Sequence, residues 1–127
     1  MGSWIELKAE DGHKLPAYKA EPSGKPRGGI VVIQEIFGVN SHIKSVADGY
    51  AADGYLVIAP AMFDRAQRNY DTGYSQPEIE AGRKVMQGLD WGNTIKDVAA
   101  AVASAKSAGK VGIVGYCWGG TVAWLAA

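Results

Sequence analysis

The feature that most constrains this chain is a pair of glycines around its single cysteine, in the pattern Gly115-Tyr116-Cys117-Trp118-Gly119. A short apolar run from Val111 to Val114 enters the pattern, and a helix-like segment from Thr121 to Ala127 leaves it. A nucleophile at the tip of a tight strand-to-helix turn is crowded by neighbouring backbone, and glycine two residues to either side removes the Cβ atoms that would clash. The pattern therefore predicts a nucleophile elbow that presents the cysteine.

The cysteine also has a simpler interpretation, because cysteine is among the most buried residue types and often serves only as a small hydrophobe. The strand expected before Cys117 and the helix expected after it favour the elbow instead. Such a helix aims its first backbone N–H groups and the positive end of its dipole at the sulfur, and at any oxyanion that forms beside it. The sequence thus predicts a thiol at a helix N-terminus.

Composition and charge limit the partners that we expect. The 127 residues are enough for one domain with a single core, which we expect to span residues 1–127. Thirteen basic and thirteen acidic residues cancel, which argues against nucleic acid or an anionic membrane as the main partner. No apolar run approaches transmembrane length, no signal peptide is recognisable, and a lone cysteine suits a reducing cytoplasm. We expect neither a cofactor nor a metal ion.

Five stretches have the composition of β-strands. The first two flank the hairpin signal Asp11-Gly12, and Pro16 favours an edge position for the second of them. The other three are continuous apolar runs, which are typical of strands buried on both faces. In chain order the strands are expected at Trp4–Lys8, Lys14–Glu21, Gly29–Gln34, Tyr55–Ala59 and Val111–Val114.

Helical periodicity appears between the last three strands. One apolar stripe runs from Ile43 to Ala51, a second helix begins near Pro77, and a third stripe runs from Ile95 to Ala105. A hairpin followed by alternating strands and helices predicts an α/β fold, with a mainly parallel sheet and helices on both faces.

The order of the strands follows from the handedness of their connections. Right-handed crossovers can place the second parallel strand on one side of the first and the third on the other. We therefore expect about five strands in the order 1-2-4-3-5, with a ligand crevice where the first and third parallel strands meet. Glu35 ends one of these strands and Cys117 follows the other, so the two should face each other. The alternative for Glu35 is a solvated acid at a strand end.

Two separate stretches of the chain carry a more specific pattern. The first is Gln34-Glu35-Ile36-Phe37-Gly38-Val39-Asn40, followed by Ala47–Tyr55 and Ala59-Pro60, and the second is Val111–Gly120. In both, the chain resembles the N-terminal half of dienelactone hydrolases, and the resemblance extends from Trp4 to the end. It implies a truncated α/β-hydrolase fold and hydrolysis of a lactone or ester, typically the cyclic dienelactones of aromatic degradation.

The resemblance also implies roles for individual residues. Cys117 would be the nucleophile, and Glu35 would contact its thiol and take part in its ionisation. The oxyanion hole would be formed by the backbone N–H groups of Ile36 and Trp118. Arg83 lies on the helix from which the family contributes contacts to a substrate carboxylate, so it is a candidate for substrate binding.

One departure from the family pattern concerns the rest of the catalytic triad. In this fold the nucleophile is followed along the chain by an acid and then by a histidine. Residues 118–127 contain no Asp, Glu or His, and both histidines lie upstream of Cys117. We expect His13 to be a turn residue and His42 a polar residue at a helix start. The chain alone is therefore expected to be a largely inactive fragment.

Two alternatives remain open from the sequence. Another chain could supply the missing Asp and His, which would make this chain half of a split hydrolase. The chain could instead be a non-catalytic, self-associating doubly wound module whose cysteine is incidental. We expect a homodimer because the strand at residues 110–115 would be an open edge and the helix at residues 118–127 would be bare. Its interface should include Val111 and Ile113.

The remaining aromatic and polar residues give fewer constraints. Trp91 and Trp124 are expected in the core. The polar stretch from Ala61 to Gln76 is expected to be a long loop. Side chains in such a loop can line a pocket or simply be solvated, and the candidates here are Arg65, Tyr70 and Tyr74.

Overall fold

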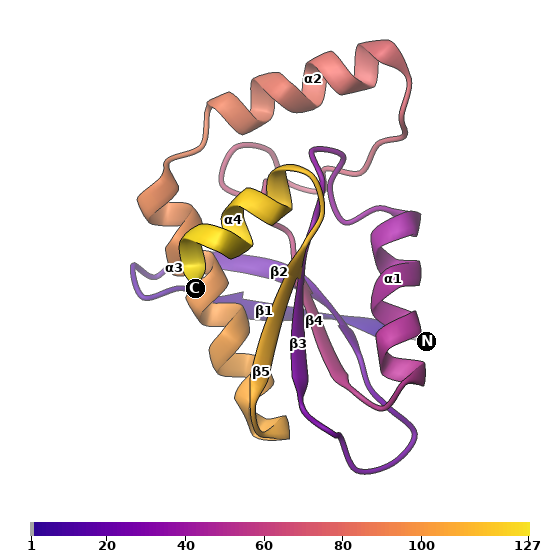
Figure 1. The fold of residues 1–127 in the computed structure, drawn as a ribbon. Coiled ribbons are helices and arrows are strands. Elements are labelled where there is room, and N and C mark those ends of the chain that lie inside the picture. The colour runs from indigo at the N-terminus through magenta and orange to yellow at the C-terminus, as the bar shows by residue number, and fades with distance from the viewer. Residues whose placement is uncertain (1) are drawn as a thin grey trace.

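A five-stranded mixed sheet lies at the centre of the structure, a computed structural model that describes residues 2–127 (Figure 1). The strands are β1 (Gly2–Lys8), β2 (Lys14–Ala20), β3 (Gly29–Ile33), β4 (Leu56–Pro60) and β5 (Val111–Gly115). Their order is β1-β2-β4-β3-β5, which confirms the order expected from the sequence. β3 pairs parallel with both β4 and β5, whereas β2 pairs antiparallel with β1 and β4. The predicted elbow therefore follows a strand of the parallel part of the sheet.

Pro16 lies inside the sheet, so the expectation that it would place β2 at an edge is wrong. β2 pairs with β1 on one side and with β4 on the other. The pairing with β4 begins at Ala17, so Pro16 stands just beyond it and needs no N–H on that side. Its carbonyl accepts a hydrogen bond from the N–H of Ala61 at 2.9 Å. A proline therefore fits where the pairing of two strands ends, just as it fits on an outer edge strand, because neither position needs a backbone N–H donor.

Helices cover both faces of the sheet, as expected. α1 (Ser41–Ala52) packs on one face, and α3 (Trp91–Ala105) and α4 (Trp118–Ala126) pack on the other. α2 (Gln76–Gln87) lies across the carboxyl ends of the parallel strands (Figure 1). Successive side chains of β3 divide between the two cores, because they point to opposite faces of the sheet. None of the helices within residues 2–127 combines the length and the apolar character that crossing a membrane requires.

Three of the helices begin at side chains suited to that position. Asn40 caps α1 and Asp90 caps α3, each by accepting a hydrogen bond from a backbone N–H of the first turn. Ser75 and Glu78 form a reciprocal capping box at the start of α2. A short 3-10 helix, Lys106–Ala108, follows α3 directly. These local signals explain why the helices begin near where the sequence predicts.

A network of charged side chains fastens the β1–β2 hairpin to the rest of the molecule. Arg65, in the loop after β4, donates to Asp11 at 2.8 and 3.0 Å and to Asp97 of α3 at 2.9 and 3.0 Å. The hydrogen bonds from Arg65 hold the pKa of Asp11 well below its ordinary value. Beside this network, Nε2 of His13, the residue before β2, lies 3.0 Å from Oδ2 of the buried Asp64. Arg65 is thus a structural residue and does not line a pocket of the predicted site.

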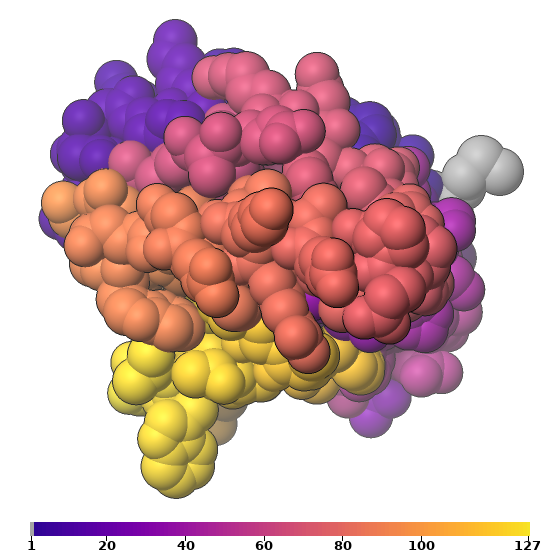
Figure 2. Space-filling model, turned by 90° about the horizontal axis from the view of Figure 1, so that it is seen from above, coloured from indigo at the N-terminus to yellow at the C-terminus, as the bar shows by residue number. Residues whose placement is uncertain are grey.

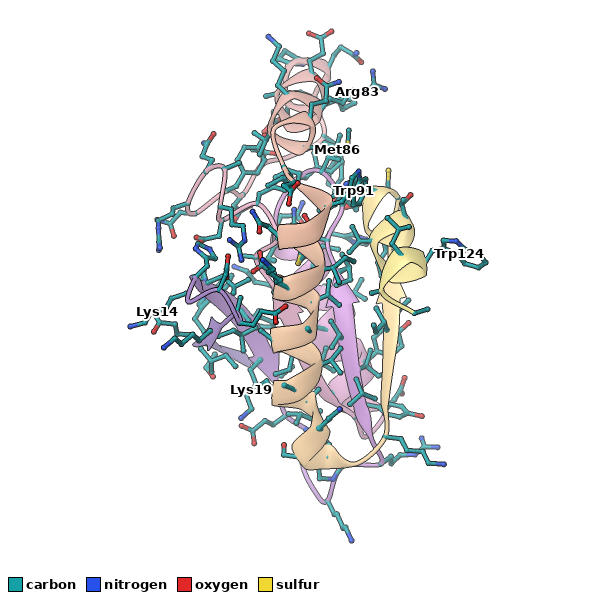
Figure 3. All side chains as sticks on the ribbon, turned by 90° about the vertical axis from the view of Figure 1, so that its left-hand side faces the viewer. Lys14, Lys19, Arg83, Met86, Trp91 and Trp124 are labelled. Atoms are coloured by element: carbon teal, nitrogen blue, oxygen red, sulfur yellow. The ribbon has the colours of Figure 1, made fainter. Side chains whose placement is uncertain are left out.

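The least covered part of the molecule is the sheet edge at β5 together with the outer side of α4, the helix that follows it. β5 pairs with β3, and no strand within residues 2–127 pairs with its other side. On α4, Trp124 is 81% exposed and Leu125 50% exposed, because this helix buries its opposite side against the sheet. Trp124 projects from the molecule in Figure 3, and the C-terminal segment protrudes in the view of Figure 2. Trp91 is 46% exposed, so the expected core positions of both tryptophans are wrong.

Candidate active site

Cys117 occupies a backbone conformation that few side chains adopt. Its φ of 58° and ψ of −122° lie in the positive-φ region, which only Asn69 shares among the non-glycine residues from 2 to 127. β5 ends at Gly115 and α4 begins at Trp118, so Cys117 stands on the sharp turn between them. The residue is exposed, and its side chain makes no capping hydrogen bond to α4. This is the strand-turn-helix geometry that the glycine spacing predicts.

Close backbone contacts explain the two flanking glycines. A Cβ atom on Gly115 would overlap the carbonyl group of Gly119, and a Cβ atom on Gly119 would overlap the carbonyl oxygens of Ile33 and Gln34. By contrast, a Cβ atom on Gly112, in the same strand, would meet open space. The explanation of the spacing drawn from the sequence is therefore confirmed.

The start of α4 places hydrogen-bond donors beside the sulfur. The first N–H groups of a helix have no acceptor within it, and Trp118 is the first residue of α4. The N–H group of Gly119 donates to the carbonyl oxygen of Tyr116, and that of Gly120 donates to the carbonyl oxygen of Cys117, at 2.9 Å each. The Trp118 N–H and the positive end of the helix dipole are thus placed to favour a thiolate or an oxyanion at the elbow.

A hollow of about 310 Å³ opens beside the elbow. Its lining comes from the β3–α1 loop, from α2 and from the elbow itself: Ile36, Phe37, Ile79, Arg83, Met86, Cys117 and Trp118. Arg83 is the one charged residue of this lining, and in Figure 3 it lies with Met86 on α2, near the start of α4. Gly82 allows α2 to approach, because a Cβ atom there would overlap the carbonyl oxygen of Ile36. The structure therefore gathers every predicted site residue except Glu35 around one hollow.

Glu35 reaches the same end of the sheet but bonds to a residue outside the predicted site. Ile33 pairs with Gly115 across β3 and β5, so Glu35 and Cys117 each stand two residues beyond that pair. Oε1 of Glu35 accepts a hydrogen bond from the hydroxyl of Tyr74 at 2.8 Å. The two residues are 39 positions apart, so no local pattern identifies this contact. The only sequence signal for Tyr74 is an aromatic residue in a long polar loop.

Neither histidine lines the hollow beside Cys117. His13 lies at the hairpin, and His42 is exposed in the first turn of α1, which agrees with the positions expected for both. Tyr70 lines a different hollow, of about 410 Å³, next to Trp4 and Pro16. Among the side chains of residues 2–127, no three of His, Cys, Asp and Glu gather as a metal site would require.

Comparison with known proteins agrees with this geometry. Residues 15–127 match the sequence profile of the dienelactone hydrolase family. The chain belongs to the dienelactone hydrolase family. A carboxymethylenebutenolidase of Pseudomonas putida is 34% identical to this family member, over 97% of the chain and 54% of the relative. A Synechocystis protein assigned by name to the same enzyme is 38% identical, over 90% of the chain and 49% of its own length.

Solved structures agree on the fold of this dienelactone hydrolase-family chain. A Klebsiella pneumoniae protein assigned to the dienelactone hydrolases aligns with a TM-score of 0.80 at 28% identity, over 100% of this chain and 55% of its own. A dienelactone hydrolase-like promiscuous phosphotriesterase from metagenomic libraries has a TM-score of 0.73 at 22% identity, which shows the fold alone. The chain thus has α/β-hydrolase architecture, and it spans about half the length of the relatives it matches.

Proposed function

We propose that this chain provides the nucleophile and the oxyanion donors of a dienelactone hydrolase-type hydrolase of carboxylic esters or lactones. One observation carries the proposal: Cys117 stands on a positive-φ turn at the N-terminus of α4, beside an apolar hollow. Family membership and the carboxymethylenebutenolidase relatives support the same class of reaction.

In the proposed reaction the Cys117 thiolate attacks the carbonyl carbon of the substrate, so that a C–S bond forms and the carbonyl π electrons move to oxygen. The backbone N–H groups of Trp118 and Ile36 stabilise this oxyanion. When the C=O bond re-forms, the bond to the leaving oxygen breaks, and that oxygen takes up a proton. Water then cleaves the thioester, which releases the carboxylic acid and restores the thiol.

Arg83 and Glu35 have supporting roles in this proposal. Arg83 brings a positive charge to an otherwise apolar lining, so it would bind a substrate that carries a carboxylate besides the bond to be cleaved. A dienelactone with a carboxylate substituent has this chemistry. Glu35 stands at the end of the strand next to β5 and takes part in ionisation of the thiol.

We also propose that the 127-residue polypeptide turns over esters slowly by itself. Residues 118–127 supply neither the acid nor the histidine that follow the nucleophile in this fold, and both histidines lie away from the hollow. Without a positioned base the acyl-enzyme persists, because nothing activates the water that would cleave it. A hydrolase completed by an Asp and a His from another chain, and a non-catalytic module, are the alternatives that activity measurements separate.

The uncovered side of the sheet leads to a proposal about assembly. We propose that a second copy covers it, with the two β5 edges paired antiparallel around a two-fold axis. The segment from Val111 to Ala127 contains no charged residue, and an apolar hollow of about 270 Å³ lies between Ile113 and α3. Lys106 is the one charged residue that lines this hollow, so the surface is largely apolar and complementary to itself. The proposal includes a cytoplasmic location, since a catalytic thiol must stay reduced.

The solution mass from light scattering tests the assembly. A dimer at micromolar concentration that Trp124→Ser converts to a monomer would support the second copy. A wild-type monomer would mean that another segment or partner covers this side, or that it stays open, and either contradicts the dimer.

Rapid mixing with p-nitrophenyl acetate tests the function. We expect a burst of about one p-nitrophenolate per chain, then slow turnover, because acylation needs only the elbow whereas deacylation needs the base. Cys117→Ala should abolish the burst, and Tyr55→Phe, away from the elbow, should leave it intact. Rapid sustained turnover would contradict the proposed inactivity, and a burst that survives Cys117→Ala would contradict the nucleophile.

A further inference from the structure

The Glu35 carboxylate is held by a hydrogen-bond chain that begins at the cap of α1. Asn40, only 3% exposed, accepts from the N–H of Ile43 at 3.1 Å through its side-chain oxygen. Its side-chain nitrogen donates to the carbonyl of Thr72 at 3.1 Å and to the hydroxyl oxygen of Tyr74 at 3.2 Å. The Tyr74 hydroxyl in turn lies 2.8 Å from Oε1 of Glu35. One capping side chain thus connects a helix start to the predicted active site.

The chain has a fixed direction. A hydroxyl group has one hydrogen, and the oxygen of Tyr74 already accepts from Asn40, so its hydrogen points to Glu35. Burial raises the pKa of Tyr74, the hydrogen bond from Asn40 lowers it and the Glu35 carboxylate raises it, so that the net shift is upward and the phenol keeps its hydrogen at neutral pH. Tyr74 is therefore the donor and the Glu35 carboxylate the acceptor of this hydrogen bond.

The segment that carries Tyr74 is fixed along the loop after β3. The N–H of Thr72 donates to the carbonyl of Phe37 at 2.9 Å, and a single β-bridge joins Asp71 to Gly38. The rings of Phe37 and Tyr74 meet edge to face, with their centroids 4.4 Å apart. These contacts to Phe37 and Gly38 hold the backbone before Tyr74 and one edge of its ring, although the Tyr74 side chain is half exposed.

We propose that Tyr74 is a positioning residue that holds the Glu35 carboxylate and thereby sets the pH at which Cys117 ionises. The proposal rests on the proposed function, in which Glu35 and Cys117 interact. A carboxylate that approaches a thiolate disfavours it, because like charges raise the pKa of the thiol. A carboxylate that accepts a hydrogen bond from Tyr74 has part of its charge compensated and is restrained from turning toward the sulfur. Tyr74 would thus keep the thiol easier to ionise than Glu35 alone would allow. Arg83, the one charged side chain that lines the hollow beside Cys117, favours the thiolate in every variant compared and so does not alter this difference.

The rate of alkylation of Cys117 by iodoacetamide, measured against pH, tests this without any turnover. The proteins are the wild-type chain, Tyr74→Phe, Glu35→Gln and the double variant. Tyr74→Phe should move the midpoint of the profile upward by on the order of 0.5 pH unit, and so slow alkylation about threefold below the midpoint. Glu35→Gln should move the midpoint downward. The double variant should match Glu35→Gln, because without the carboxylate the hydroxyl has nothing to restrain.

Tyr116→Phe is the matched control. Tyr116 directly precedes Cys117, but its hydroxyl lies 3.4 Å from that of Tyr50, and both tyrosines are partly buried against the core on the α1 side. Its removal should leave the midpoint unchanged.

The outcomes separate this proposal from the one on which it rests. A Tyr74→Phe profile like that of the wild type overturns the role of Tyr74, even if Glu35→Gln shifts the midpoint as expected. A Tyr74→Phe shift that persists in the double variant overturns it too, because the effect would then be a general loosening of the loop. A Glu35→Gln profile identical to the wild type overturns the interaction between Glu35 and Cys117 and the role of Tyr74 that depends on it, whereas the role of Cys117 as nucleophile is decided separately by the burst of p-nitrophenolate.

Discussion

β4 and β5 are parallel strands of equal length and similar apolar composition, yet they differ in how fully they are covered. Every residue of Leu56–Pro60 is buried, whereas none of Val111–Gly115 is. β4 lies between β2 and β3, and both α1 and α3 pack on it. β5 has β3 as its partner and leads into the elbow. An apolar run therefore predicts a strand but not what covers it, and the turn that carries Cys117 follows the less covered strand.

The largest expected difference comes from the same truncation made in each strand. Ile58 of β4 is fully buried and Ile113 of β5 is partly exposed, and both contribute to the core beneath α3. Ile58→Ala should lower the free energy of unfolding by about 4 kcal/mol, because it leaves a cavity that the structure cannot close. Ile113→Ala should cost about 1 kcal/mol, because much of its surface is already hydrated. Urea denaturation of both variants measures the difference. Both variants are compared at a protein concentration low enough to keep the chain monomeric, and equal losses there would contradict the partial exposure of β5 within one copy. Losses that become more equal as the concentration rises would support the proposed dimer.

Two glycines of β5 sharpen the comparison within one strand. Gly115→Ala should cost about 3 kcal/mol, since its Cβ atom would displace the backbone of Gly119 at the elbow. Gly112→Ala should stabilise the strand by about 0.5 kcal/mol, because its Cβ atom meets open space and alanine loses less entropy. Thermal unfolding followed by circular dichroism gives both values. If the two variants have the same midpoint, the turn is looser than these contacts imply.

Removing a charge from the Arg65 network, on the well-covered side of the sheet, should lower the free energy of unfolding by somewhat less. Asp97 has a side chain only 1% exposed and accepts two hydrogen bonds from Arg65. Asp97→Asn should lower the free energy of unfolding by about 2 kcal/mol, because it removes a buried charged acceptor from the partly buried guanidinium of Arg65. Asp53→Asn, at an exposed helix end, is the control and should change it by less than about 0.5 kcal/mol. Comparable losses in a urea titration would mean that the network does not fasten the hairpin.

The smallest expected effect is a change in pH dependence at the same network. Arg65 depresses the folded-state pKa of Asp11 below its unfolded value near 4, so the contribution of Asp11 to stability is present above about pH 4 and is lost as pH falls below it. Asp11→Asn should therefore lose less stability than the wild type between pH 5 and pH 2. Glu10→Gln, in the same turn, serves as the control. The measurement is the urea midpoint as a function of pH across this range. If the midpoints of the Asp11→Asn variant and the wild type fall in parallel, the ion pair between Asp11 and Arg65 forms only weakly in solution.

Much of the fold is predictable from local features of the sequence. The apolar runs of β3, β4 and β5, the cap at Asp90 and the glycines of the elbow each act through neighbours in the chain, and right-handed crossovers then fix the strand order. Trp124 shows the limit of this reasoning, because an apolar helix reveals nothing about which of its sides is covered. The hydrogen-bond partner of Glu35 is equally unpredictable from the sequence, because Tyr74 lies in a long loop and contacts Glu35 only in the folded structure.

The central claim is that Cys117 is the nucleophile of an ester or lactone hydrolase elbow. The most direct measurement is peptide mass spectrometry after a brief reaction with p-nitrophenyl acetate and an acid quench. We predict one acetyl group per chain, located on the peptide that contains Cys117 and absent from the Cys117→Ala variant. Acetylation at any other residue, or an unmodified Cys117 after release of p-nitrophenolate, would contradict it.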